Sequence, residues 1–342
     1  MQASAVGLYQ GLPISDPASL QDVTIEVGEP QGREILVAVM ATAVNPIDTK
    51  QRQGQATVTE PRILGFDAVG KVLAVGETVT TIMPDDIVYY AGAVNRPGSD
   101  AQYQLVDERL VAQAPKSWTP AQSAGLPLTT LTAWEALFEK LPFVAAPQAN
   151  QGHSVLIING AGGVGSMAIQ LAKWAGLTVV TTAGKIATKA WVEELGADVV
   201  LDYHDDLATQ LANAGMPDGV EHAIILHSTD RYLPIVAPLV RPLGTIVAVV
   251  TNQEPLPMEL LKAKSLNFAW EFMFTKSDYQ LPAMAMQGCI LARVAQLADA
   301  GELVPTTKRI FDGINAANLR AAHEVVETGQ MLGKVVLTAP FK

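Results

Sequence analysis

The sequence predicts an α/β protein in which a β-rich domain is joined to a doubly wound domain built on a parallel sheet. Three observations predict this fold class. Residues 1 to about 115 contain short strand-like runs separated by Gly, Pro, Asp and Asn, which are the residues that turns require. From residue 154 to about 274, strand-like and helical runs alternate, as in parallel sheets. Between the first of these strands and the first helix lies a glycine-rich turn.

The N-terminal region is expected to form a compact barrel or sandwich, because its strands are short and closely spaced. Its clearest strand-like segments are residues 34–40, 70–75, 86–90, 101–106 and 109–113. The composition changes at Pro115–Pro120, and a helical segment follows at residues 129–141. We therefore predict that the first domain contains residues 1–126.

The strand, turn and helix of residues 154–176 predict a dinucleotide site. Residues 155–158 are apolar and rich in β-branched side chains, which is typical of a strand buried on both faces. The turn has the spacing G-x-G-x-x-G, and an amphipathic helix follows it as far as Gly176. In this context the glycines allow a tight turn, a close approach of the pyrophosphate and close packing of the helix on the strand. The predicted contacts are Gly160, Ala161, Gly162, Gly163, Val164 and Gly165. An ordinary glycine-rich turn is the alternative.

The second domain is predicted to contain residues 127–275, and residues 276–342 are predicted to return to the first domain. Strand-like runs occur at residues 155–158, 178–182, 199–201, 222–226, 244–250 and 265–274. Six strands with helices between them are what a doubly wound sheet contains. The segment after residue 275 is mostly helical and has few such alternating units.

Composition excludes several classes of protein. The chain has 342 residues, of which 49% are hydrophobic and 17% charged, so we expect a globular protein. A net charge of −11 argues against nucleic acid or an anionic membrane as a partner. The N-terminus has no signal-peptide pattern and no apolar run reaches about 18 residues, which predicts a cytoplasmic protein. The single cysteine, Cys289, excludes an intramolecular disulfide and is predicted to be a buried, inert thiol.

Several motifs together make the chain similar to the medium-chain dehydrogenase/reductase superfamily. The segments 45–50 (NPIDTK), 65–70 (GFDAVG), 126–134 (LPLTTLTAW) and 160–165 resemble the quinone oxidoreductase branch. The stretch 270–275 (WEFMFT) resembles the subgroup labelled "zinc-type alcohol dehydrogenase-like". This resemblance implies a GroES-like catalytic domain joined to a Rossmann domain, and it implies an oxidoreductase.

The residues argue against a catalytic zinc. By the resemblance, Asn45 stands where zinc-dependent relatives have a cysteine and Phe66 where they have a histidine. The segment 128–130 has no thiol or imidazole in place of the second cysteine. The five histidines (residues 153, 204, 222, 227 and 323) show no zinc-binding spacing. We therefore expect no metal.

NADPH is the predicted cofactor. Enzymes that prefer NAD place a carboxylate about 20 residues after the glycines, but the second strand here ends without one, at residues 181–185. Gly184 and the cation of Lys185 suit a 2′-phosphate, with Lys189 in reserve. Plain solvated lysines are the alternative. The resemblance adds Tyr203 near the adenosine phosphate.

Residues that follow strands of the parallel sheet are expected to border the nicotinamide, because ligands bind at the carboxyl ends of such strands. They are Ser228, Thr229 and Val250. Lys334, in the C-terminal segment, is a further predicted cofactor contact, with a surface lysine as the equal alternative.

Without zinc, hydrogen-bond donors must polarise the substrate carbonyl, which suits quinones and α,β-unsaturated carbonyls. The resemblance implies the candidate catalytic residues: Asn45 as donor to the substrate carbonyl or to the nicotinamide ribose, Asp48 as organiser of its loop, Thr130 near the nicotinamide, and Tyr90 at the mouth or as proton source. For each of them the alternative is a polar residue that caps a loop or a packed aromatic residue. The alternatives are an NADPH-binding protein with little turnover and a metal-free alcohol or aldehyde dehydrogenase. We expect a homodimer that pairs through residues 265–274. The acceptor, the proton donor and the choice of one- or two-electron reduction stay open.

Overall fold

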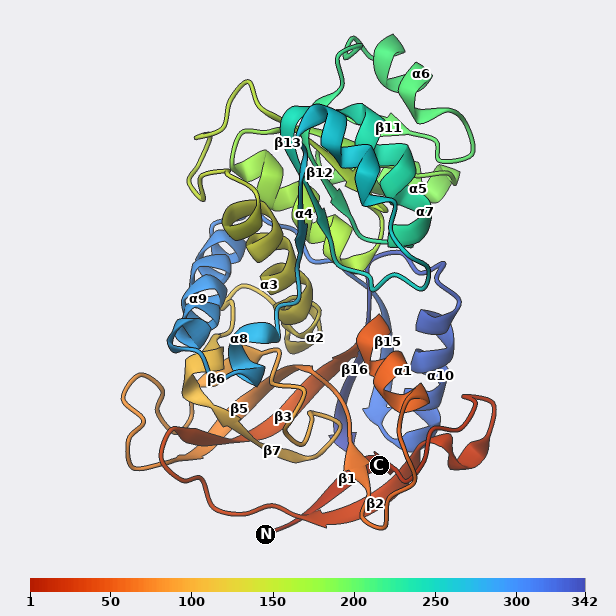
Figure 1. Cartoon of the computed structure of the whole chain (residues 1–342). Helices are drawn as coiled ribbons and strands as arrows, with labels where there is room; N and C mark the ends of the chain where they lie inside the picture. The colour runs from red at the N-terminus through yellow and green to blue at the C-terminus, as the bar shows by residue number, and fades with distance from the viewer. Residues whose placement is uncertain (342) are drawn as a thin grey trace. The chain divides into compact units, whose positions relative to one another are not determined.

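The computed structural model describes residues 1–341, and the chain folds into two compact units. Unit 1 comprises Met1–Leu131 and Phe274–Lys342, and unit 2 comprises Thr132–Met273 (Figure 1). A β-rich unit and a unit with a parallel sheet confirm the predicted fold class. The chain enters unit 2 at residue 132 and leaves it at residue 273, whereas the predicted boundaries follow residues 126 and 275.

Unit 1 is built on a seven-stranded sheet of order β15-β16-β3-β5-β6-β8, in which β7 also pairs with β3, and on a three-stranded sheet of order β2-β1-β4. Its strands are β1 (Gln2–Leu8), β2 (Gln21–Glu26), β3 (Glu34–Val44), β4 (Arg62–Ile63), β5 (Asp67–Val75), β6 (Ile87–Tyr90), β7 (Tyr103–Asp107), β8 (Val111–Gln113), β15 (Thr307–Ile314) and β16 (Lys334–Phe341). The long strand β3 organises the sheet: its first half pairs with β7 and its last residues pair with β16.

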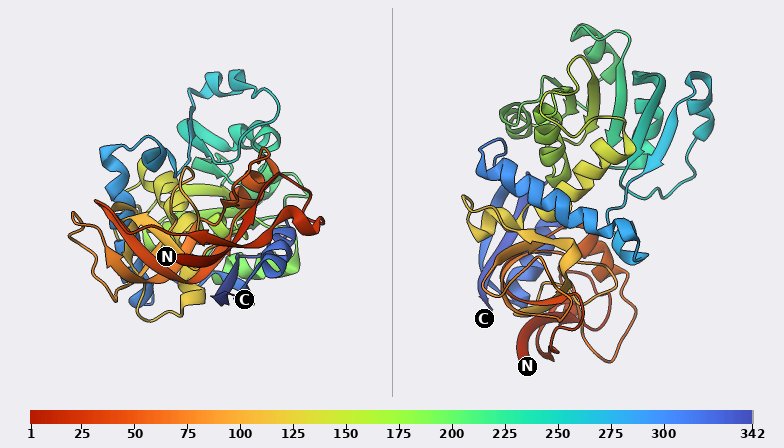
Figure 2. Two further views of the ribbon diagram at one scale, coloured as in Figure 1. Left: turned by 90° about the horizontal axis from the view of Figure 1, so that it is seen from below. Right: turned by 90° about the vertical axis from the view of Figure 1, so that its left-hand side faces the viewer.

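Helices cover this sheet and close the core of unit 1. They are α1 (Pro46–Gln53), α2 (Pro120–Ala124), the start of α3 (Pro127–Glu135), α8 (Thr275–Asp278), α9 (Ala285–Asp299) and α10 (Ala316–Glu327). Helix α9 packs on β8, and α10 packs on α1 and β15 (Figures 1 and 2). The fully buried Arg52 of α1 donates to the Glu327 carboxylate of α10, which fixes the two helices to each other.

Unit 2 contains a fully parallel six-stranded sheet of order β11-β10-β9-β12-β13-β14. Its strands are β9 (Ser154–Ile158), β10 (Thr178–Thr182), β11 (Val199–Leu201), β12 (Val220–Ile225), β13 (Val240–Ala248) and β14 (Asn267–Trp270); its helices are the end of α3, α4 (Gly163–Trp174), α5 (Ile186–Glu194), α6 (Leu207–Asn213) and α7 (Thr229–Val236). The strand order reverses between β9 and β12. Helices lie on both faces of the sheet (Figure 2), as in doubly wound folds.

The last predicted strand of this sheet, residues 265–274, is shorter than expected. Strand β14 ends at Trp270, and Phe274 belongs to unit 1. There its ring lies 4.7 Å from the ring of Phe66, centroid to centroid. The alternation of aromatic residues therefore continues past the end of the strand.

The prediction that Cys289 is buried was wrong, because this residue is exposed. The buried positions of α9 include Gln287, Ile290, Leu291 and Val294, and Cys289 lies out of phase with this stripe.

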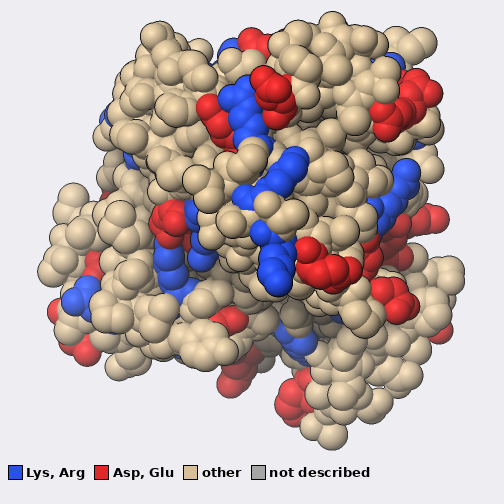
Figure 3. Space-filling view, turned by 45° about the horizontal axis from the view of Figure 1, so that its top comes forward, with Lys and Arg blue, Asp and Glu red and all other residues tan. Residues whose placement is uncertain are grey.

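Charges of both signs are mixed on the surface. In the face shown in Figure 3, Lys and Arg side chains lie beside Asp and Glu side chains and form no separate basic field. Among residues 1–341, no helix combines the length and apolar character that a membrane span requires.

Candidate functional site

Four segments that are distant in the sequence meet around the carboxylate of Asp67 in unit 1. Asp67 Oδ1 accepts a hydrogen bond from the backbone N–H of Leu128, with an N···O distance of 2.7 Å. Asp67 Oδ2 accepts from Asn45 Nδ2 at 2.9 Å and from Lys334 Nζ at 2.8 Å. Lys334 also donates to Asn45 Oδ1. The three side chains are almost completely buried, with exposed fractions of 0% for Asp67, 1% for Asn45 and 2% for Lys334.

The sheet of unit 1 brings these residues together. In the pairing of β3 with β5, Ala43 lies opposite Asp67, and in the pairing of β3 with β16, Val44 lies opposite Val335. The end of β3 therefore lies between the starts of β5 and β16. Asn45, which follows β3, contacts side chains from both neighbouring strands as a result.

Helix α1 starts at this point and fixes the backbone of Asn45. Asn45 is its N-cap and Pro46 is its first residue, a position that proline favours because it needs no donor there. Asp48 Oδ2 accepts from the backbone N–H of Asn45 at 2.7 Å. Through this hydrogen bond, Asp48 can order the loop, as its predicted role requires.

Asp48 is a buried carboxyl group with spare hydrogen-bonding capacity. Its Oδ1 atom is buried without a partner, and burial raises its pKa to about 7. Burial, and then the neighbouring Asp48, also raises the pKa of Asp100 well above its ordinary value. Lys334 pairs directly with Asp67 and not with these two groups. Asp48 is thus poised to hold a proton near neutral pH.

Asp48 should make the stability of the protein depend on pH. Because its pKa is raised from 3.8 to about 7, the native state binds more protons than the unfolded state between these values. The stabilisation is fully present below pH 4 and is lost as the pH rises through 7, a change of about 4 kcal/mol for three pKa units. Urea unfolding at several pH values should show this fall in wild type and a weaker one in Asp48→Asn. The control Asp85→Asn changes an exposed aspartate, and equal pH slopes in wild type and Asp48→Asn would contradict the expectation.

The other two candidate catalytic residues are also buried. Thr130 lies in α3 and is fully buried, and its Oγ1 atom has no partner. A buried hydroxyl without a partner is costly, so this atom is available to a ligand. Tyr90 differs from expectation. Its ring lies in the core of unit 1 and its hydroxyl donates to Gln104 Oε1 at 2.9 Å, while burial raises its pKa. It does not lie at a mouth, and burial opposes its ionisation.

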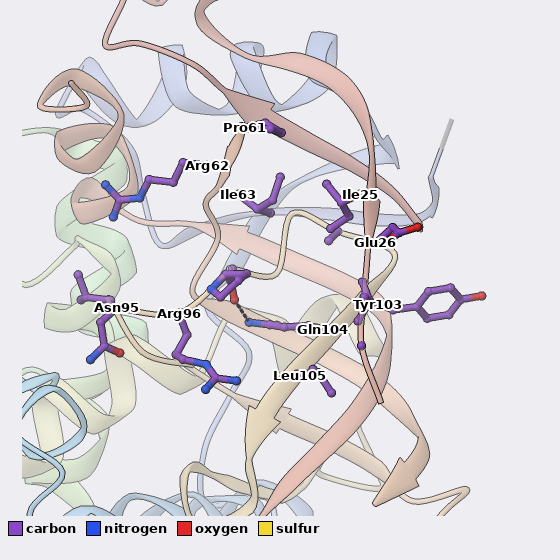
Figure 4. Close-up of a pocket in the computed structure, with 16 residues that line it drawn as sticks. Ile25, Glu26, Pro61, Arg62, Ile63, Asn95, Arg96, Tyr103, Gln104 and Leu105 are labelled. Carbon is purple, nitrogen blue, oxygen red and sulfur yellow. Dashed lines mark hydrogen bonds between the residues drawn. The ribbon is translucent and has the colours of Figure 1, made fainter. Parts of the chain in front are cut away.

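Figure 4 shows a cavity of about 580 Å³ in unit 1, lined by parts of β2, β4 and β7 and by residues 94–98. Gln104 lines it and donates to the carbonyl oxygen of Pro97 at 3.0 Å. None of the predicted site residues lines this cavity. The candidate site is therefore defined by the buried polar cluster around Asp67.

The residues of this cluster do not fit a zinc ion. Zinc requires thiolate, imidazole or carboxylate ligands in tetrahedral geometry. Here the ammonium of Lys334 is bonded to the oxygens of Asn45 and Asp67, and Phe66 packs against Phe274. Within the described part of the chain, no three His, Cys, Asp or Glu side chains are placed to hold a metal ion.

The glycine turn of unit 2 is tightly packed at Gly160 and Gly165 and more open at Gly162. A Cβ atom on Gly160 would lie 2.1 Å from Thr181 Oγ1, and one on Gly165 would lie 2.4 Å from the carbonyl oxygen of Asn159. These two glycines allow the turn and the packing of α4. The atom nearest to a Cβ on Gly162 would be Asn159 Nδ2, at 3.1 Å, and the carbonyl oxygen of Asn159 would lie at 3.6 Å. Gly162 is the N-cap of α4, and its open side fits a phosphate at the helix N-terminus.

The next turn holds the residues predicted for the adenosine end. Gly184 lies under Tyr203, since a Cβ on Gly184 would be 2.5 Å from Tyr203 Cζ. Lys185 is exposed at the N-cap of α5. Lys189, predicted as a reserve cation, is instead 2.8 Å from the carboxylate of Asp202. That hydrogen bond, and those from His204, lower the pKa of Asp202.

The residues predicted near the nicotinamide gather after β12 and β13. Ser228 has a left-handed backbone with φ of +43°, and Thr229 starts α7. The Thr229 hydroxyl donates to the carbonyl oxygen of Val250. These three residues lie in unit 2, whereas Lys334 is buried in unit 1. The alternative of Lys334 as a surface lysine is wrong.

Sequence patterns gave no sign that Asp67 is the centre of this cluster, although the residue lies in the motif at residues 65–70. A buried carboxylate with three donors is visible only once the four segments are assembled.

Two family models match the chain. The model for the alcohol dehydrogenase GroES-like domain matches residues 31–116, and the model for zinc-binding dehydrogenases matches residues 163–287. Among curated proteins, the chain is 44% identical to a zinc-type alcohol dehydrogenase-like protein of Staphylococcus aureus, over 90% of this chain and 91% of that protein. It is 39% identical to an NADPH-dependent alkenal/one oxidoreductase of Arabidopsis thaliana, over 52% of this chain and 47% of that protein.

Solved structures agree with these matches. A Rhizobium etli protein assigned to the zinc-dependent alcohol dehydrogenases is similar with a TM-score of 0.95 and 39% identity, covering 100% of this chain and 99% of that one. A quinone oxidoreductase from Coxiella burnetii is similar with a TM-score of 0.80 and 28% identity, covering 99% and 100%. The fold, the glycine turn and these relatives show that the chain is an oxidoreductase of the medium-chain dehydrogenase/reductase superfamily.

Proposed function

We propose that this protein uses NADPH to reduce quinones or α,β-unsaturated carbonyls, without zinc. The observation that carries the proposal is the buried cluster in which an amide, Asn45, and an ammonium, Lys334, are held around Asp67. A bound nicotinamide would supply the hydride. The role of the protein is then to hold the acceptor and to stabilise the negative charge that develops on its oxygen, which hydrogen-bond donors do well in a buried site.

The cofactor part of the proposal is supported by unit 2. The open side of Gly162 would accept the pyrophosphate, and residues 228, 229 and 250 would border the nicotinamide. Lys185 would pair with the 2′-phosphate, because a phosphate favours a cation. The Arabidopsis relative is named as NADPH-dependent.

The substrate class is supported by the donor set and by two relatives. Asn45 supplies an amide N–H, and Thr130 has a buried hydroxyl without a partner. Alcohol oxidation is disfavoured, because it requires a metal or a strong base to remove the proton. Two of the relatives are named as a quinone oxidoreductase and an alkenal/one oxidoreductase.

The direct test follows absorbance at 340 nm with NADPH or NADH and a panel of acceptors. The panel contains 1,4-benzoquinone, 9,10-phenanthrenequinone, an enone and a simple ketone, each with and without a chelator. Turnover of quinones or the enone that is selective for NADPH and insensitive to chelator supports the proposal. Loss of turnover with the chelator would contradict the proposal that the reaction needs no zinc. Tight NADPH binding without any turnover favours a binding protein instead.

Lys185→Ala should weaken NADPH binding about 10-fold and leave NADH binding unchanged, since one charge-assisted hydrogen bond contributes about 1.5 kcal/mol or more. Fluorescence titration with both cofactors measures the two dissociation constants. Lys173→Ala is the matched control, because Lys173 pairs with Asp198 on the surface of the same unit. Equal weakening of NADPH and NADH by Lys185→Ala would rule out contact with the 2′-phosphate.

We also propose a homodimer formed through β14. This strand ends the sheet order of unit 2, so its outer edge is available for pairing. Trp270, the last residue of β14, and Phe272, two residues later, are 43% and 46% exposed, which is high for large apolar side chains. Light scattering that shows a monomer at micromolar concentration would overturn this proposal.

A further inference from the structure

We infer that Lys334 and Asp67 are positioning residues, which hold the Asn45 carboxamide so that an N–H points to the acceptor. This inference rests on the proposed function. The orientation of the amide follows from chemistry. A lysine ammonium can only donate, so the Asn45 atom that it contacts is the oxygen. The Asp67 carboxylate accepts, so the Asn45 atom at 2.9 Å from it is the nitrogen.

One donor of Asn45 is left for a ligand. The amide nitrogen has two N–H bonds, of which one goes to Asp67 Oδ2. The other has only the carbonyl oxygen of Ala43, at 3.5 Å, which is too far for a strong hydrogen bond. Without Lys334, the amide oxygen would lose its donor and the carboxamide would be held by Asp67 alone. The amide plane could then turn about the bond to Asp67, which would carry the second N–H away from the acceptor.

The charges show why Lys334 positions the amide and does not polarise the substrate. Its ammonium lies 2.8 Å from the carboxylate of Asp67, and both groups are buried. Two opposite charges at this distance largely cancel when viewed from further away. The backbone N–H of Leu128 fixes the other oxygen of Asp67. The pair is therefore a rigid neutral support beneath Asn45.

The test is Lys334→Met in the full chain, measured with the acceptor that wild type reduces. We expect kcat to fall about 100-fold, the loss typical of a misplaced oxyanion donor, while the dissociation constant for NADPH stays within about 2-fold. Lys71→Met is the control, because Lys71 pairs with Asp85 on the exposed side of the same unit. A large rise in the NADPH dissociation constant at unchanged kcat would make Lys334 a cofactor ligand and overturn the inference.

A double mutant shows whether Lys334 affects kcat through Asn45 or independently of it. If Lys334 acts through Asn45, Asn45→Ala/Lys334→Met should be no slower than Asn45→Ala alone. A second full 100-fold loss would overturn the inference. Where Lys334→Met does not fold because it leaves the Asp67 carboxylate unpaired, Lys334→Met/Asp67→Asn removes both charges. This variant should also be slow, and wild-type kcat in it would overturn the inference.

An NMR measurement that needs no turnover distinguishes failure of the positioning role from failure of the proposed function. In protein labelled with ¹⁵N at asparagine, the side-chain amide signals missing from Asn45→Ala belong to Asn45. These signals should shift in Lys334→Met, and unchanged signals would overturn the positioning role. If they shift while wild type reduces no acceptor, the positioning role stands and the proposed function fails.

Discussion

Asn45→Ala is expected to reduce kcat by about 100- to 1,000-fold, the range found when one donor to a developing oxyanion is removed. The structure gives the reason: one amide N–H of Asn45 binds Asp67, Lys334 donates to the amide oxygen, and the second N–H has only the carbonyl oxygen of Ala43, at 3.5 Å. NADPH affinity should change little, because the glycine turn and Lys185 belong to unit 2. Steady-state kinetics and a cofactor titration on the same preparation measure both quantities.

Asn45→Asp is the sharper comparison for this prediction. Aspartate has nearly the same size and also caps helices well, so α1 should keep its start. A carboxylate cannot donate, however, and it adds a negative charge beside Asp67. We expect Asn45→Asp to be at least as slow as Asn45→Ala. Wild-type activity in Asn45→Asp would show that no donor is needed at this position.

Gly162→Ala should weaken NADPH binding strongly and leave the fold intact. A Cβ at residue 162 would lie 3.1 Å from the side-chain amide of Asn159 and 3.6 Å from its carbonyl oxygen, and the backbone there has φ of −73°, which alanine adopts freely. The added methyl group would instead occupy the space of the pyrophosphate. We expect the dissociation constant to rise by 100-fold or more, about 2.7 kcal/mol, with an unchanged melting temperature of the unliganded protein.

Gly165→Ala should differ from Gly162→Ala because it should also destabilise the fold. Its Cβ would overlap backbone atoms of residues 159 and 160, so α4 would have to move away from β9. We expect a loss of about 1–3 kcal/mol in stability, as for overpacked sites, together with weaker cofactor binding. Gly28→Ala is the control, because its Cβ would meet no atom within 4 Å. Unchanged NADPH affinity in Gly162→Ala would show that the phosphates do not lie there.

The sequence was sufficient for the fold and for the glycine turn because both depend on local patterns. A buried β-branched strand, three spaced glycines and an amphipathic helix lie within 23 consecutive residues, and the structure places β9, the turn and α4 there. Motif resemblance likewise pointed to Asn45 and Thr130, which the structure places in unit 1 together with Lys334, and Lys334 contacts Asn45 directly.

The partners of these residues required the assembled structure. Asp67 and Lys334 are 267 positions apart, and no local pattern indicates that they pair. The burial of Tyr90 in the core, the end of β14 at Trp270 and the burial of Phe274 in unit 1 also depend on packing between distant segments. Alternation of aromatic residues alone indicates neither where a strand ends nor which unit buries them.

The exposed thiol of Cys289 gives the chain a single attachment point for a dye. Cys289 lies on α9 in unit 1, while four of the five tryptophans (residues 134, 174, 191 and 270) lie in unit 2. Energy transfer from these indole rings to an acceptor on Cys289 depends on the distance between donor and dye. Cys289→Ser, treated with the same dye, should show no energy transfer because it has no thiol to react. Because each chain has one thiol, a change in the donor–dye distance on cofactor addition can be measured as a change in the efficiency of energy transfer.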